Sequence, residues 1–270
     1  MKRCIIGAIC TVLMIAAAHT AMAGVFLEGM TTESSGKQIT HDMYIKSDRV
    51  RIDIKEKNSK MIMIYRQDED VFWMLDGEKR KYMAMTREDL KEMRTMMDEA
   101  MKQMEEQLKN LPPEQRAMME SMMGDQMSQA AKEPEMTYKL VGKKVKVDSW
   151  TCDHYIGYED GDKVIELWTV DPKDVKLDAK EFSALESLAD FFKELAPDEG
   201  NFFEIGSTKM SKGETGPDFY GIPVKSVYYD TDGESATTIL RKAERQDLDN
   251  SLFEIPEGFE KESLEDFEME

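Results

Sequence analysis

Short alternating segments separated by polar turns fill residues 25–85 and constrain the fold more than any other feature of the chain. Each segment is rich in β-branched, aromatic or other apolar residues, and each break is polar and only a few residues long. Such breaks join sequential strands as hairpins. We therefore expect an antiparallel meander with strands at 25–33, 38–46, 50–56, 61–66, 71–75 and 80–85.

Alternation of apolar and charged residues within these strands predicts one solvent-exposed face and one buried face. Val50, Ile52 and Ile54 alternate with charged residues, so the apolar side chains share a face. Strand patterns then resume after residue 135, and we expect them to continue the same sheet. These later strands are expected at 136–147, 150–158, 163–170, 222–230 and 235–243.

A methionine-rich stretch at 87–131 interrupts the strands and predicts a helical hairpin. Thirteen of the 23 methionines lie between Met83 and Met136. The apolar residues from Leu90 to Leu111 fall within an arc of roughly 140° on a helical wheel. Pro112-Pro113 divides the stretch into two helices, the second at about 114–131. Because methionine is flexible and polarizable, this face suits a pliable lid over the sheet.

A further helix is expected at 179–196. Asp178 and Glu181 have the spacing of a capping box, and apolar residues then recur at helical intervals until Pro197. The expected fold class is therefore α+β: a curved antiparallel sheet whose concave apolar face is covered by the methionine-rich hairpin and this helix.

The N-terminus has the pattern of a cleaved secretory signal at 1–23. Lys2 and Arg3 precede an apolar run that ends at Ala21-Met22-Ala23. The run is too short for a transmembrane segment, and no later stretch approaches one. We expect a soluble periplasmic protein with one half-barrel domain at 24–259, the helical insertion at 87–131, and an acidic tail at 260–270.

Charge and cysteine content limit the partners of the mature chain. Removal of residues 1–23 leaves 34 basic and 55 acidic residues, a net charge of −21. Such a chain repels nucleic acid and anionic bilayers, and the sequence suggests no compensating Lys/Arg cluster. Cys152 is the one cysteine left, so an intramolecular disulfide is excluded, and a buried inert thiol is the favoured interpretation.

Several segments resemble a family of exported bacterial proteins that carry a domain of unknown function. They are Asp48-Arg49-Val50-Arg51, the strand pair 71–75 and 80–82, Cys152-Asp153-His154-Tyr155, Glu166-Leu167-Trp168, and the closing segment 252–259. That family is similar to the half-barrel lipoprotein carriers LolA and LppX. The resemblance implies a curved sheet whose concave apolar face accepts acyl chains, but it transfers no residue with a known role.

We expect the protein to bind an apolar ligand, a lipid or acyl chain, between the sheet and the helices. Burial of apolar surface supplies affinity without precise polar geometry. The alternative for each single residue is that it simply fills the core. The candidate lining residues are Met93, Met97, Met101, Met104, Met118, Met122, Phe182, Phe191, Phe192, Trp73 and Trp168.

Two other functions stay open. Thioether pairs at helical i, i+4 spacing, such as Met97 and Met101, suit Cu(I), and Cys152 and His154 are weak metal candidates that share a strand face. The usual ligand spacing of zinc sites is absent. The hairpin also suits a non-catalytic module that binds an envelope protein partner. Because the common nucleophile, nucleotide and zinc motifs are missing, we expect a non-enzyme without a cofactor.

Overall fold

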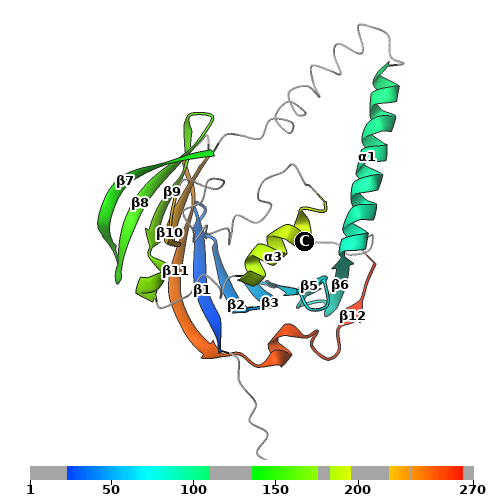
Figure 1. Ribbon diagram of the computed structural model, residues 1–270, viewed down its shortest axis with the longest axis horizontal. Helices are drawn as coiled ribbons and strands as arrows, with labels where there is room; N and C mark the ends of the chain where they lie inside the picture. The colour runs from blue at the N-terminus through cyan, green and yellow to red at the C-terminus, as the bar shows by residue number, and fades with distance from the viewer. Residues whose placement is uncertain (1–22, 110–135, 176–182, 196–218, 231–232, 264–270) are drawn as a thin grey trace, which may run out of the picture.

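The computed structural model describes residues 23–109, 136–175, 183–195, 219–230 and 233–263. Within them, twelve strands form one curved sheet with two α-helices and two short 3₁₀ helices (Figure 1). The strands are β1 (Ala23–Glu33), β2 (Gln38–Lys46), β3 (Arg49–Glu56), β4 (Ser59–Arg66), β5 (Val71–Asp76), β6 (Lys81–Thr86), β7 (Met136–Val147), β8 (Trp150–Glu159), β9 (Asp162–Val170), β10 (Ile222–Asp230), β11 (Gly233–Asp247) and β12 (Glu260–Lys261). The helices are α1 (Arg87–Lys109), η1 (Pro172–Val175), α3 (Ser183–Phe192) and η3 (Asn250–Phe253).

The strand order joins two meanders through the first and eleventh strands. It runs β12-β6-β5-β4-β3-β2-β1-β11-β10-β9-β8-β7. Every pairing is antiparallel except the parallel pairing of β12 with β6. β7 and β12 stand at opposite ends of the order, so this sheet is open. The expected α+β class with a curved, mostly antiparallel sheet is thus confirmed.

Helix α3 packs into the concave side of the sheet. Ala184, Leu188, Phe191 and Phe192 are buried on one face of this helix. The Phe191 ring lies 5.5 Å from the ring of Tyr65 in β4, and these aromatic contacts tie the helix to the sheet. In the described residues the helix ends at Phe192, before the expected end at 196, and the expected start at 179–182 lies outside the described residues.

Helix α1 does not cover the concave face along its described length, contrary to our expectation. Leu90 is buried and Met93 packs against the core, but beyond this turn the helix leaves the sheet (Figure 1). Met96, Met97 and Met101 are 61%, 56% and 45% exposed. The amphipathic pattern is present, but α1 extends from β6 near one end of the sheet, so only its first turns reach the sheet. The second predicted helix, at 114–131, lies outside the described residues.

The C-terminal segment covers the opposite, outer face of the central strands. After β11 the chain passes through η3 and then pairs with β6 as β12 (Figure 1). Leu248 and Phe253 from this segment are buried against five residues of β4 and β5. The central strands therefore contact α3 on the inner face and this segment on the outer face. The sheet gains its last strand at 260–261, where we expected an acidic tail to begin. The five sheet residues are Ile62, Ile64, Val71, Trp73 and Leu75.

Candidate apolar binding site

A row of five apolar residues crosses the concave face at one register position. Met43 in β2 lies opposite Ile52 in β3, and Ile52 lies opposite Met63 in β4. Met63 in turn lies opposite Met74 in β5, which lies opposite Met83 in β6. Directly opposed side chains in antiparallel strands share one face and are nearest neighbours. We name these five residues the methionine row.

The methionine row borders the part of the sheet that α3 covers. The next row towards α3 consists of buried residues and includes Tyr65 and Phe72, on which Phe191 and Phe192 pack. In the methionine row itself, Met43 and Met83 are 8% and 7% exposed, whereas Met63 and Met74 are only partly buried. Solvent therefore reaches the middle of the row. The covered row is Ile45, Val50, Tyr65, Phe72 and Met85.

Polar groups border the other side of the methionine row. His41 lies opposite Ile54, and Asp76 lies opposite Met61. The His41 Nε2 atom is 2.9 Å from the Thr31 hydroxyl, which is 2.8 Å from the Thr238 hydroxyl. Burial lowers the pKa of His41, so its imidazole is neutral near pH 7. An apolar strip with a polar rim suits a ligand with an acyl chain and a polar end.

The sequence analysis did not predict this row, because it considered the methionines only as residues at helical spacing. Met61 and Met63, and Met83 and Met85, are two residues apart and therefore share a strand face. That period was visible in the sequence. The register that aligns Met63 with Met74 and Met83 was not, because it depends on the lengths of the turns between the strands.

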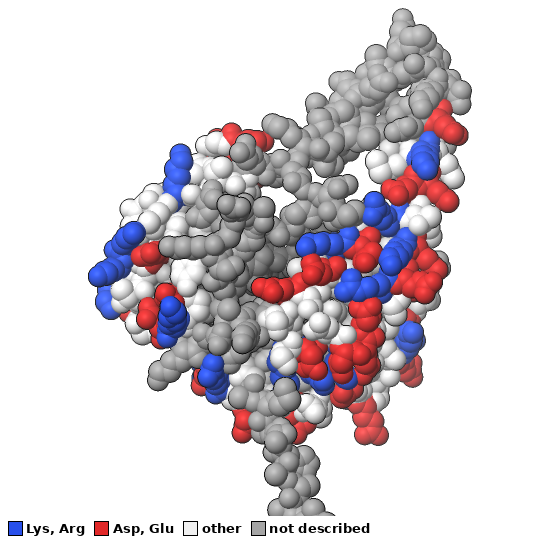
Figure 2. All heavy atoms as spheres, in the orientation of Figure 1, with Lys and Arg blue, Asp and Glu red and all other residues white. Residues whose placement is uncertain are grey.

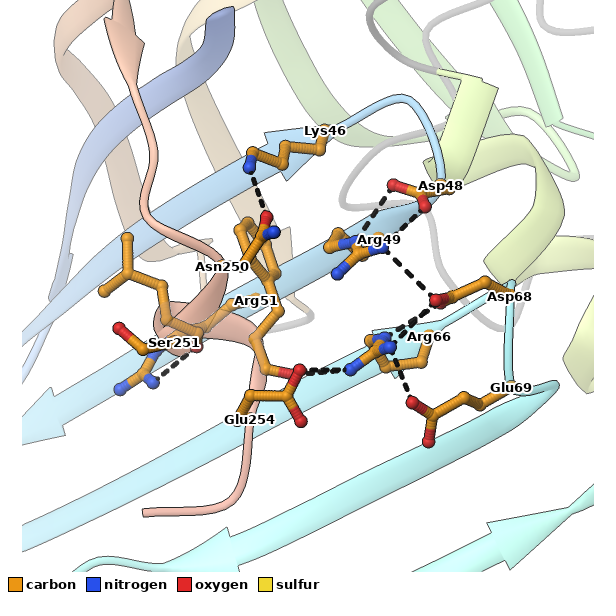
Figure 3. A network of polar contacts seen from close by, with 12 residues as sticks. Lys46, Asp48, Arg49, Arg51, Arg66, Asp68, Glu69, Asn250, Ser251 and Glu254 are labelled. Carbon is orange, nitrogen blue, oxygen red and sulfur yellow. Dashed lines mark hydrogen bonds and ion pairs between the residues drawn. The ribbon is translucent and has the colours of Figure 1, made fainter. Parts of the chain in front are cut away.

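A charged network on the outer face binds the C-terminal segment to the sheet (Figure 3). The Arg51 Nη1 atom donates a 2.8 Å hydrogen bond to the Leu252 carbonyl, and its Nε atom donates a 2.6 Å bond to Asp53. Arg66 donates a 2.6 Å bond to Glu254. These arginines are 10% or less exposed, so the bonds are shielded from solvent.

Further contacts extend this network at its rim. The Lys46 Nζ atom donates a 2.7 Å bond to the Asn250 side chain, and Arg49 bridges Asp48 and Asp68 at 2.7 and 3.2 Å. The hydrogen bond from Arg49 lowers the pKa of Asp48. The network thus joins 48–51 to 252–259, two of the segments that carry the family resemblance. Their contacts hold the C-terminal segment against the sheet.

The structure brings together only some of the predicted lining residues. Phe191, Phe192 and Met93 belong to the concave core. Trp73 lies in the outer cluster with Phe253, because it alternates with Phe72 along β5. Trp168 packs at the margin of the concave core and stacks on His154, with ring centroids 4.3 Å apart. Three other members lie on α1, where Met97 and Met101 are exposed and Met104 is partly exposed. The remaining members, Met118, Met122 and Phe182, lie outside the described residues.

Cys152 and His154 lie in different environments. Cys152 is 1% exposed, and burial raises the pKa of its thiol to about 11, so it stays protonated near neutral pH. The His154 Nε2 atom instead lies 2.7 Å from the Glu166 carboxylate. Glu166 also accepts a 2.8 Å hydrogen bond from the Tyr229 hydroxyl. Across the described ranges, no three His, Cys, Asp or Glu side chains are arranged to hold a metal ion.

A separate hollow at the base of α1 is lined mainly by charged residues. Its volume is about 920 Å³. Because ionic side chains prefer water to hydrocarbon, this hollow does not suit an acyl chain. The concave face is therefore the better candidate site. The hollow is lined by Glu69, Asp70, Thr86, Arg87, Glu88, Lys91, Glu92, Thr95 and Met96.

The fold and site define an open, curved antiparallel sheet with an apolar inner face, held between a helix and a C-terminal segment. The chain belongs to the family described as Domain of unknown function (DUF4412), whose model matches residues 85–259. No significant match to a curated protein was found. In the described part of the chain, none of the helices combines the length and the apolar character needed to cross a bilayer.

Two solved structures are similar over most of this chain. One is an uncharacterized conserved protein from Thermus thermophilus, with a TM-score of 0.43 and 9% identity, covering 89% of this chain and 91% of that one. The other is PNGF-II, with a TM-score of 0.37 and 9% identity, covering 89% of this chain but 31% of that one. These scores carry no functional inference.

Proposed function

We propose that this protein is an exported, periplasmic binding protein that holds an apolar ligand, a lipid or acyl chain, on its concave face. The observation that carries the proposal is the methionine row, in which three neighbouring strands place Met63, Met74 and Met83 side by side. A sheet core is served equally well by Leu, Ile or Val. Methionine adds the ability to repack around ligands of different shape.

The energetics favour a ligand with a long apolar part. Each Å² of apolar surface removed from water contributes about 25 cal/mol, so a bound chain needs no precise polar geometry. Met63 and Met74 are partly exposed and offer this surface next to α3. The resemblance to half-barrel lipoprotein carriers supports the same proposal, with α3 taking the place of the predicted hairpin as the cover. We propose no catalytic step.

Substitutions in the methionine row test the proposal. Met63→Gln/Met74→Gln should weaken binding of a fluorescent acyl chain by about tenfold or more, because two polar amides replace the apolar contact. Met63→Leu/Met74→Leu should keep the affinity and narrow the range of chains accepted. The matched control is Met96→Gln/Met97→Gln/Met101→Gln on the exposed face of α1, which should bind as the wild type does. Unchanged binding by the Met63/Met74 Gln variant contradicts the proposal.

Cu(I) binding is a second candidate function that the same row favours. Thioether sulfur is a soft ligand, and adjacent strands present three of them at one register position. Competition against a chromogenic Cu(I) chelator under anaerobic conditions measures this directly. The variant Met63→Leu/Met74→Leu/Met83→Leu separates the two functions, because it removes the sulfur atoms and keeps the apolar surface. Loss of copper binding with retained acyl-chain binding would assign both functions to the row.

A further inference from the structure

The terminal strand β7 exposes apolar and basic side chains together. Leu140 and Val141 are 42% and 50% exposed, the two most exposed large apolar residues outside α1 in the described chain. Four lysines lie on the same strand and are exposed. Figure 2 shows basic side chains along the margin of the molecule where Figure 1 places β7. The lysines are Lys139, Lys143, Lys144 and Lys146.

No described carboxylate forms an ion pair with these lysines. Lys139 lies 4.7 Å from the ring centroid of Tyr158, and the Lys146 Nζ atom donates a hydrogen bond to Thr151. The hairpin also contains Asp148 in its turn and Asp153, whose Oδ1 atom accepts a hydrogen bond from the backbone nitrogen of Lys144. The positive charge of this edge is therefore only partly compensated, although the whole chain carries a net charge of −19.

The backbone of β7 is irregular where the lysines lie. Its register against β8 shifts between Leu140 and Gly142 and again between Gly142 and Val145, and Lys144 has a φ of 55°. Such bulges and edge lysines oppose the addition of a regular strand from another chain. They do not oppose contact with a surface that needs no backbone hydrogen bonds. This favours a lipid surface over an extended peptide as the partner.

We infer that β7 docks the protein on an anionic membrane surface. The ammonium groups of Lys143, Lys144 and Lys146 face the lipid phosphates, and Leu140 and Val141 enter the interface between headgroups and acyl chains. The net negative charge of the chain opposes this contact weakly, because salt screens charges more than about 8 Å away. At this edge the inference differs from the sequence-based expectation that anionic bilayers repel this protein. The inference rests on the proposed function and deepens it by naming a bilayer as the source of the apolar ligand.

Co-sedimentation with vesicles tests the docking surface separately from ligand binding. The wild-type protein should bind vesicles that contain phosphatidylglycerol, should bind pure phosphatidylcholine weakly, and should dissociate as salt rises. Lys143→Glu/Lys144→Glu/Lys146→Glu should reduce binding by about tenfold or more, since each basic residue near the surface contributes. The charge-matched control, Lys57→Glu/Lys91→Glu/Lys102→Glu, should stay close to the wild type.

A second variant tests the apolar contact. Leu140→Ser/Val141→Ser keeps all charges and should weaken binding without changing its salt dependence. Absence of wild-type binding to phosphatidylglycerol vesicles overturns the inference, and so does an equal loss in the charge-matched control. Fluorescent acyl-chain binding, measured without vesicles, stays normal in every β7 variant if only the docking surface is affected. Loss of vesicle binding with retained acyl-chain binding therefore leaves the proposed function intact.

Discussion

Individual charged side chains on the outer face stabilise this protein through bonds that are shielded from water. Arg51 is the clearest example, because its guanidinium joins Asp53 on the same strand to the carbonyl of Leu252 in the C-terminal segment. Both members of the Arg51 and Asp53 pair are 10% or less exposed. Removal of one member leaves the other buried without its partner.

We predict that Arg51→Ala lowers the free energy of unfolding by about 3–5 kcal/mol, the usual cost of breaking a buried ion pair. The matched control is Lys37→Ala, which removes an exposed ion pair with Glu56 and should leave the urea midpoint close to that of the wild type. Urea titration followed by circular dichroism measures both. Equal losses in the two variants would contradict the role given to Arg51.

Titration of His41 should make stability depend on pH. Burial lowers the pKa of His41 below its usual 6.5. Just below pH 6.5 the imidazole is therefore protonated in the unfolded chain while it stays neutral in the folded chain. Stability should therefore fall as pH falls below about 6.5. His41→Gln should flatten the stability profile between about pH 7 and 5. Parallel profiles for wild type and variant would show that His41 does not carry the effect.

The Cys152 thiol should be inert in the folded protein. With a pKa of about 11 and 1% exposure, it is neither ionised nor accessible at pH 8. A soluble aromatic disulfide reagent should modify it only after denaturation, and Ser or Ala at this position should not change ligand binding. Rapid modification of the native protein would contradict its assigned burial.

At the scale of elements, most strands can be predicted from the sequence, whereas the segments that pack on the two faces of the sheet cannot. Alternating residues and polar turns locate the strands to within a few residues, because both signals are local. The position of α1 and the path of residues 248–259 depend on distant contacts that no local pattern encodes. Trp73 lies on the outer face and not on the predicted inner face, because the C-terminal segment covers it there. Val71, Trp73 and Leu75 are accordingly apolar on a face that was expected to be exposed to solvent.

The C-terminal segment should therefore be as important for stability as α3. Phe253 is fully buried on the outer face, and Phe191 is fully buried on the inner face. We predict that Phe253→Ala and Phe191→Ala each lower the free energy of unfolding by about 3–5 kcal/mol. Phe259, which packs at the margin of the outer cluster, is the control and should cost less when replaced by Ala. A negligible effect of Phe253→Ala would mean that the segment is only loosely attached.

At the scale of the whole molecule, the outer face of the central strands is closed by the C-terminal segment, while the inner face keeps a partly exposed apolar row. The part of the site on α3 could be predicted, because Phe191 and Phe192 stand out in an amphipathic helix. The part on the sheet could not, because it arises from the register of four hairpins. The site as a whole is consistent with an apolar ligand that approaches from the concave side.

The most direct test is to purify the protein from its native host under mild conditions and extract it for mass spectrometry of bound lipids. Our account predicts about one lipid or acyl chain per protein molecule, which the Met63→Gln/Met74→Gln variant should lose and the Met63→Leu/Met74→Leu variant should keep. An extract free of lipid from correctly folded wild-type protein, which also fails to take up added acyl chains, would contradict the account.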